Sequence, residues 1–176
     1  METNFIRTVF SKEEIEARIR ELGRAITADY AGKELAAIGV LKGSLYFLAD
    51  LTRCIDLPLT LDFMSIGLYQ GTMKTGVVRI VKDIDFDVSG KHVLIVEDII
   101  RTGLTTGYLV QNIEARGPAS VKVCTLLLSP SQLLLSLPVA YTGFEVTDAW
   151  LAGYGMDIGE RWRNLPYIAE AERKKP

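Results

Sequence analysis

The chain has 176 residues, of which 48% are hydrophobic and 24% charged, and its formal net charge is −2. This size and balance predict one globular domain and exclude a strongly basic protein that binds nucleic acid through its overall charge. A single histidine excludes a metal site built from several histidines. The two cysteines, Cys54 and Cys124, follow no CxxC pattern and lie among apolar residues, so we interpret them as buried core thiols.

The first ten residues lack the basic start and the long apolar stretch of a signal peptide. No run approaches the ~18–20 apolar residues of a membrane span. We therefore expect a cytoplasmic protein with no membrane partner. Because no repeat or linker interrupts the chain, we expect a single domain over residues 1–176, with a core at about 1–128 and a small hood at about 129–176.

The first half of the chain predicts alternating helices and strands. Ser11 and Glu14 form the S-x-x-E capping pattern, and apolar residues follow at helical spacing, so a helix is predicted from residue 12 to about 30. Further elements are expected in this order: a strand at 35–41, a tight turn, a helix at 45–54, a strand at 59–66, an exposed loop at 67–76 and a strand at 77–82.

The second half continues this alternation and then changes character. Residues 93–96 are β-branched and apolar, which is typical of a strand buried on both faces, and a helix at 104–115 and a strand at 121–128 follow. This order predicts an α/β fold with a mainly parallel sheet flanked by helices, in which ligands bind beyond the carboxyl ends of the strands. After residue 129, prolines and glycines predict short irregular strands that cap the sheet.

The segment 93–106 carries the clearest chemical signal. Glu97 and Asp98 end the buried strand, and a turn rich in threonine and glycine leads into the next helix. Backbone N–H groups and hydroxyls at a helix N-terminus suit a phosphate, whereas carboxylates bind sugar hydroxyls or a hard cation such as Mg2+. The pattern therefore indicates a phosphorylated sugar, and a capped helix without such a ligand is the plainer alternative. The turn matches neither GxGxxG nor GxxxxGK[ST], which argues against a Rossmann dinucleotide site and against a P-loop.

This segment resembles the phosphoribosyl-pyrophosphate (PRPP) motif of type I phosphoribosyltransferases, and its Glu-Asp pair is similar to that of the hypoxanthine-guanine branch. The resemblance extends in order along nearly the whole chain. It includes Leu41-Lys42-Gly43-Ser44 as the pyrophosphate loop, Leu68-Tyr69 in the mobile loop, and residues 143–148, 153–157 and 163–167 as the purine-binding hood and C-terminal region.

The resemblance implies the type I phosphoribosyltransferase fold and a transfer of the 5-phosphoribosyl group from PRPP to a 6-oxopurine in purine salvage. The products would be the nucleoside monophosphate and pyrophosphate. The cofactor would be Mg2+. Members of this family are usually dimers or tetramers, so a homodimer or homotetramer is implied as well.

The resemblance also implies a role for each matching residue. Glu97 and Asp98 would hold the ribose hydroxyls and Mg2+, and Asp157 would help to bind a second Mg2+. Tyr69 would close over the reaction. The substrate-binding residues would be Thr102, Gly103, Leu104 and Thr105 for the 5′-phosphate, Lys42, Gly43, Ser44 and Arg163 for pyrophosphate, and Trp150 and Leu151 for the purine.

Several of these residues also have plainer interpretations. The plainer interpretation of Lys42 is a solvated lysine in a turn, and that of Trp150 is a core tryptophan. Asp157 and Arg163 fit a surface ion pair, and Tyr69 fits an ordinary loop residue. In this family the pyrophosphate loop, which here contains Lys42, often carries a cis peptide that does not involve proline.

Three positions depart from the hypoxanthine-guanine pattern. Arg101 replaces the aspartate that is assigned to receive the N7 proton of the purine, and arginine stays protonated and cannot act as a general base. Ser129 replaces the lysine that recognises the 6-oxo group, and its hydroxyl has a shorter reach. Leu68 replaces the serine before the mobile-loop tyrosine.

These departures predict an impaired purine phosphoribosyltransferase, because a positioned acid or base contributes ~10²–10⁴-fold to a rate. The alternative is a catalytically weak paralogue that binds PRPP or a purine nucleotide, as a sensor or as a partner of an active homologue. A phosphoribosyltransferase for another base is a third interpretation.

Overall fold

The computed structural model describes residues 3–69 and 77–172. Its elements in chain order are β1 (Phe5–Phe10), α1 (Lys12–Asp29), β2 (Leu35–Leu41), α2 (Leu45–Arg53), β3 (Leu59–Tyr69), β4 (Val77–Lys82), β5 (His92–Ile100), α3 (Leu104–Glu114), β6 (Ser120–Leu128), the short 3-10 helix η1 (Pro130–Gln132), β7 (Val139–Glu145), β8 (Leu151–Ala152) and β9 (Ile168–Ala171).

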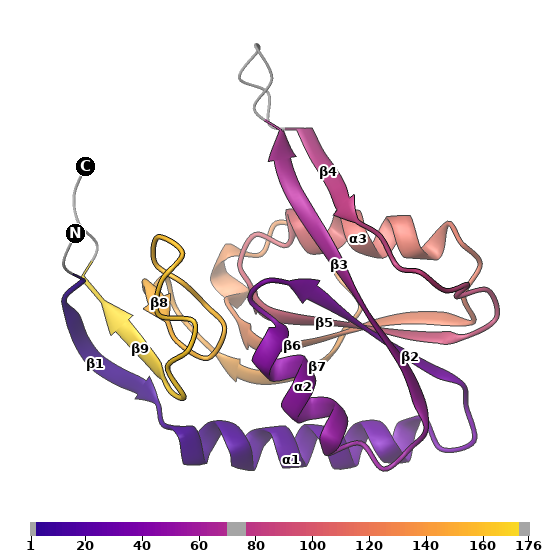
Figure 1. Ribbon diagram of the computed structural model, residues 1–176, viewed down its shortest axis with the longest axis horizontal. Coiled ribbons are helices and arrows are strands. Elements are labelled where there is room, and N and C mark those ends of the chain that lie inside the picture. The colour runs from indigo at the N-terminus through magenta and orange to yellow at the C-terminus, as the bar shows by residue number, and fades with distance from the viewer. Residues whose placement is uncertain (1–2, 70–76, 173–176) are drawn as a thin grey trace.

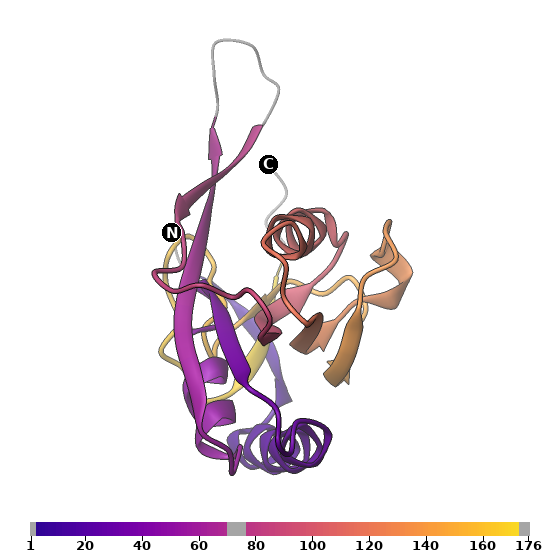
Figure 2. The ribbon, with the colours of Figure 1, turned by 90° about the vertical axis from the view of Figure 1, so that its right-hand side faces the viewer.

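A six-stranded sheet in the order β4-β3-β2-β5-β6-β7 forms the centre of the molecule (Figure 1). Strands β3, β2, β5, β6 and β7 are parallel, and β4 is antiparallel to β3. The predicted α/β fold with a mainly parallel sheet is confirmed. The β3–β4 hairpin extends well beyond the rest of the sheet in both views (Figures 1 and 2).

Helices bury both faces of the central strands. Along β2 and β5, Ala37 and Leu94 belong to the apolar cluster that includes α1 and α2, whereas their neighbours Ile38 and Ile95 belong to the cluster that includes α3. Successive side chains of a strand point to opposite faces, so a strand covered on both faces needs a continuous apolar run. This requirement explains why the strand at 93–96 could be predicted from its composition.

The predicted start of α1 is confirmed. The hydroxyl of Ser11 accepts a hydrogen bond from the backbone N–H of Glu14, and the Glu14 carboxylate accepts one from the backbone N–H of Ser11. Buried residues then recur along one face of the helix, at Ile15, Ile19 and Leu22.

The expected division between core and hood is wrong in two places. Residues 139–145 form β7, which pairs with β6 in the main sheet instead of capping it. Arg18 of α1 secures this edge strand by donating hydrogen bonds to the carbonyls of Thr142 and Gly143. In turn, the N-terminal strand β1, which was not predicted, pairs with β9 in a small sheet of order β1-β9-β8. The hood therefore contains segments from both ends of the chain.

The predicted ends of two strands also need correction. Strand β3 continues to Tyr69, where an exposed loop was expected from residue 67, because Gly67, Leu68 and Tyr69 pair with β4. The rest of that loop, residues 70–76, and the side chain of Tyr69 lie outside the described parts of the structure. Strand β5 continues to Ile100, so the acidic pair belongs to the strand.

Both thiols are free, as expected, but only Cys124 is buried, and Cys54 is partly exposed where α2 ends. Within the described residues, none of the helices has the length and apolar character needed to cross a membrane.

The capping box predicts that Ser11→Ala lowers the free energy of unfolding by about 1 kcal/mol, because the N–H of Glu14 loses its acceptor. Urea unfolding measures this loss. Ser136→Ala, at an exposed serine between η1 and β7, is the matched control. An equal loss in both variants would show that the cap does not stabilise α1.

Candidate functional site

The carboxyl end of β5 places two acidic residues in a confined position. Glu97 is buried, and its burial together with the neighbouring Asp98 carboxylate raises its pKa well above the ordinary value, although Thr106 contributes a hydrogen bond to it that lowers the pKa. Burial also raises the pKa of Asp98, and the nearby guanidinium of Arg163 opposes this rise. Two carboxylates in such surroundings favour a cation or hydroxyl groups as partners.

Three segments meet at Gly43. A Cβ atom on Gly43 would overlap the carboxylate of Asp98, and a Cβ atom on Gly155 would overlap the carbonyl oxygen of Gly43. Gly155 has φ of +100°, a conformation that side chains rarely adopt. The backbone of the turn after β2 is therefore packed against the Asp98 carboxylate on one side and the backbone of the hood loop on the other.

The turn at residues 41–44 has the peptide geometry that the resemblance implied, because the Leu41–Lys42 bond is cis. The hydroxyl of Ser44 is fully buried and donates a hydrogen bond to the carbonyl of Val40 at 2.7 Å. The Ser44 side chain thus holds the turn together, and Ser44 is not among the residues that line the cavity beside this turn.

An ion-pair cluster joins this turn to the hood. Lys42 Nζ lies 3.0 Å from Glu160 Oε2, and the same carboxylate oxygen lies 3.3 Å from Arg163 Nη2. Arg163 also pairs with Asp157 at 2.7 Å and donates to the carbonyl of Gly155 at 2.8 Å. Lys42 and Arg163 hold the pKa of the Glu160 carboxyl below its ordinary value. The Asp157–Arg163 pair matches the plainer interpretation of these two residues, whereas the sequence pattern did not indicate Glu160.

A cavity of about 420 Å³ opens between the 41–44 turn and the start of α3. Gly103, at φ +78°, precedes α3 and turns the chain into the helix. The predicted Leu104 is not among the lining residues, and its backbone N–H points at Thr102 Oγ1 over 3.5 Å. The lining includes Gly43, Glu97, Asp98, Thr102, Gly103, Thr105 and Thr106. This cavity combines hydroxyls and a helix N-terminus with the acidic pair, as a phosphorylated sugar requires.

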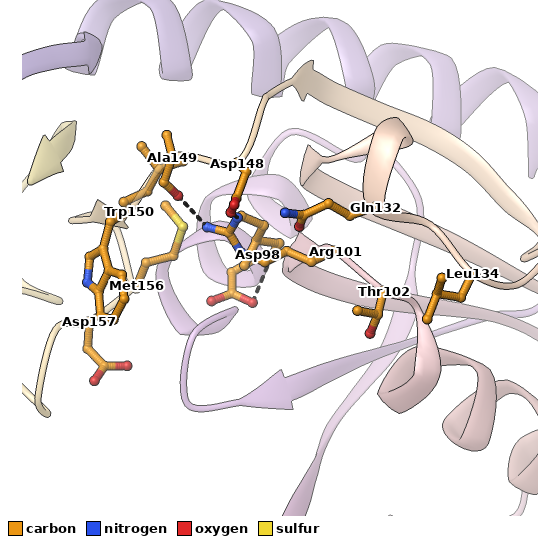
Figure 3. A pocket seen from close by; sticks show the side chains of 12 residues that line it. Asp98, Arg101, Thr102, Gln132, Leu134, Asp148, Ala149, Trp150, Met156 and Asp157 are labelled. Atoms are coloured by element: carbon orange, nitrogen blue, oxygen red, sulfur yellow. Dashed lines mark hydrogen bonds and ion pairs between the residues drawn. The ribbon is translucent and has the colours of Figure 1, made fainter. Parts of the chain in front are cut away.

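A second cavity of about 650 Å³ adjoins the first and reaches the hood (Figure 3). Asp98, Ile99, Arg101 and Thr102 line both cavities. The second cavity is also lined by Trp150, Leu151 and Asp157, and by residues that the sequence analysis did not single out, namely Gln132, Leu134, Asp148, Ala149 and Met156. We name the first the phosphate cavity and the second the base cavity.

Trp150 is 43% exposed and lines the base cavity, so the core-tryptophan interpretation is wrong. Leu151 is buried in β8 and pairs there with β9. Arg101 reaches toward the segment 148–150, which forms one wall of the base cavity. Its Nη2 donates a 2.7 Å hydrogen bond to the carbonyl of Ala149, and its Nη1 lies 3.6 Å from Asp148 Oδ1 (Figure 3).

Ser129 does not lie where its predicted role would place it. Its side chain has no exposed surface and is absent from the lining of both cavities. Its hydroxyl has no hydrogen-bond partner among the described residues. A direct contact between this hydroxyl and a base is therefore not available in this conformation.

Comparisons with known proteins agree with this geometry. Residues 7–158 match the family model of the phosphoribosyl transferase domain. The chain is 45% identical over 169 residues to a hypoxanthine-guanine phosphoribosyltransferase of Bacillus subtilis, which covers 96% of this chain and 94% of that protein. It is 43% identical over 167 residues to one of Mycobacterium bovis, with coverage of 91% and 83%.

Among solved structures, a Bacillus anthracis hypoxanthine-guanine phosphoribosyltransferase with a HEPES molecule in its active site superimposes with a TM-score of 0.90 at 40% identity. The match covers 98% of this chain and all of that one (100%). The chain therefore belongs to the phosphoribosyltransferases. Within them, it belongs to the hypoxanthine-guanine phosphoribosyltransferase family.

The contact at Gly43 predicts that Gly43→Ala lowers the free energy of unfolding by about 1–3 kcal/mol, because Asp98 or the turn must move. Chemical denaturation measures this loss. Gly107→Ala is the matched control, since its Cβ would meet only the ends of the Leu135 and Leu137 side chains, and it is expected to cost less. Equal effects of the two substitutions would contradict a tight contact at Gly43.

Proposed function

We propose that this protein transfers the 5-phosphoribosyl group from PRPP to N9 of hypoxanthine or guanine, releasing pyrophosphate. The observation that carries the proposal is the junction of the two cavities at Asp98, Arg101 and Thr102. One cavity suits a ribose phosphate, and the other offers an exposed tryptophan face to a planar base. The names and identities of the relatives support the same reaction.

Each part of PRPP has a chemically suitable partner. The 5′-phosphate would accept hydrogen bonds from the backbone and hydroxyls at the start of α3. Pyrophosphate would approach the cations Lys42 and Arg163, which stabilise the negative charge that develops as the bond to ribose C1′ breaks. Glu97 and Asp98 would hold the ribose hydroxyls, so that C1′ faces N9 of the base.

The donor set also fits Mg2+. This ion prefers carboxylate oxygens and commonly uses one or two of them together with substrate phosphates and water. Among residues 3–69 and 77–172, no group of three or more His, Cys, Asp or Glu side chains is placed to hold a metal ion. Glu97 and Asp98 would hold one Mg2+ and Asp157 would help to hold a second, and bound Mg2+ would neutralise charge on the pyrophosphate group.

Arg101 limits the acid–base part of the reaction. A guanidinium stays protonated and cannot accept the N7 proton, so we expect slow turnover. We further propose that the protein works in the cytoplasm as a homodimer or homotetramer, and sedimentation velocity of the full chain tests the assembly.

A steady-state assay with PRPP and Mg2+ tests the reaction, with hypoxanthine, guanine, xanthine and adenine offered in turn. We expect nucleoside monophosphate and stoichiometric pyrophosphate from the 6-oxopurines at a low rate. Absence of product from every base at high enzyme concentration would refute the enzymatic function. Calorimetry with PRPP and with GMP would then show whether the chain is a binding protein instead.

Asp98→Asn separates stability from binding. Because burial raises the pKa of Asp98, the charged form is disfavoured in the folded protein, and the neutral amide is expected to raise the unfolding free energy at pH 7. The same variant is expected to weaken Mg2+-dependent PRPP binding at least about tenfold, measured by calorimetry.

Asp56→Asn, at an exposed aspartate, is the matched control for this experiment and is expected to change neither quantity. Unchanged PRPP binding by Asp98→Asn would remove Asp98 from the proposed site.

Glu160→Gln tests the role of Lys42 and Arg163. The Glu160 carboxylate forms ion pairs with both cations, so pyrophosphate oxygens would have to displace it. Exposed ion pairs contribute little, and removal of this competitor is expected to lower KM for PRPP about twofold to fivefold. Glu21→Gln, which breaks a comparable pair with Arg18 on α1, should leave KM unchanged. A higher KM in Glu160→Gln would contradict displacement.

A further inference from the structure

Arg101 and Ser129 lie side by side at the ends of neighbouring strands. Strands β5 and β6 are parallel and pair Ile100 with Leu128. The backbone N–H of Ser129 then donates a 2.9 Å hydrogen bond to the carbonyl of Ile100. The two departures from the family pattern at these positions are therefore neighbours in space, and they can be interpreted together.

Their side chains differ in reach and in access to ligand. Ser129 is short, buried and absent from both cavities, whereas Arg101 lines both of them. The family pattern has a lysine at the position of Ser129. The cation that this chain lacks there is present on the neighbouring strand, because the side chain of Arg101 reaches the base cavity.

The guanidinium of Arg101 is oriented by the wall that carries Trp150. Its bond to the Ala149 carbonyl uses one N–H group of Nη2, and the 3.6 Å separation from Asp148 Oδ1 adds an ion pair without a hydrogen bond of ordinary length. A guanidinium is planar and carries further N–H donors in a fixed fork, so the remaining donors keep a defined direction.

Arg101 also lies on a particular side of any base that stacks on Trp150. It lines the phosphate cavity as well as the base cavity, whereas Leu151 lines the base cavity alone. A base joined to ribose at N9 therefore has Arg101 on the side nearer the sugar. On a purine, the edge that runs from N9 along the imidazole side presents C8–H, then N7 and then the substituent at C6.

We propose that Arg101 is the specificity-determining residue of the base cavity and donates hydrogen bonds to N7 and O6 of a 6-oxopurine. This inference rests on the function proposed above. A guanidinium forms bidentate hydrogen bonds with the adjacent O6 and N7 acceptors of guanine, which is its commonest specific contact with a base. One arginine thus reads an edge of the base that the aspartate and lysine of the family pattern would read separately.

The proposal predicts an order of binding affinities among purine ligands. Adenine presents an amino donor at C6, which faces the guanidinium donors unfavourably. A nucleoside monophosphate has an unprotonated N7, so GMP fits the site without any proton transfer. Binding of nucleotides therefore tests Arg101 separately from catalysis.

The experiment compares dissociation constants of GMP, AMP and 7-deaza-GMP, measured by calorimetry in the same Mg2+ buffer. In 7-deaza-GMP a C–H group replaces N7 and removes one acceptor. The unmodified protein is expected to prefer GMP over AMP by about 10- to 100-fold and over 7-deaza-GMP by a smaller factor. Arg101→Met keeps an unbranched chain about as long as the stem of arginine but removes the guanidinium, and it is expected to lose both preferences. Arg53→Met, at an arginine whose side chain is 80% exposed, is the matched control and should keep them.

Other results separate the two proposals. If Arg101 only braces the 148–150 segment, Arg101→Met weakens all three nucleotides by the same factor, and the specificity role is overturned while the proposed function stands. If the unmodified protein binds GMP without preference over AMP, the specificity role is overturned as well. If it binds none of the three, both proposals fail.

Discussion

The contact of Gly43 with Asp98 on one side and Gly155 on the other is the constraint on which the site depends. It joins the turn after β2 to the side chain of Asp98 at the end of β5 and to the backbone of the hood loop, and it leaves no room for a side chain at position 43. Interiors are packed closely enough that one added carbon displaces its neighbours. Because Asp98 and the 41–44 turn line the phosphate cavity, and Asp98 also lines the base cavity, the relation between the two cavities follows from this contact.

Around this contact a buried pair of carboxyl groups lies near cations that are paired with other carboxylates of the protein. Burial disfavours ionisation of Glu97 and Asp98, while Lys42 and Arg163 share the carboxylate of Glu160 nearby. A ligand that brings both a cation and anionic oxygens would relieve both conditions at once. The near-zero net charge of the chain conceals this separation of acidic and basic groups within one site.

Much of this organisation could be predicted from local patterns. The capping box at Ser11 and the apolar run before Glu97 predicted α1 and β5, because helix starts and doubly buried strands have distinctive compositions. The edge strand β7 and the strand β1 could not be placed, since β1 is mostly exposed and the position of β7 depends on pairing with β6. The buried position of Ser129, the hydrogen bond of Ser44 and the pairing of Glu160 with Lys42 also depend on distant segments, so no short pattern indicates them.

The pairing of β1 with β9 has a consequence for how the chain folds. Phe5 and Ala171 are partners in one small sheet, so this sheet joins residues from nearly opposite ends of the sequence. During synthesis β1 cannot pair with β9 until β9 has left the ribosome. Leu151 in β8 pairs with that same strand, and Trp150 directly precedes it. The wall of the base cavity is therefore completed last, after the parallel sheet and the phosphate cavity can already have formed.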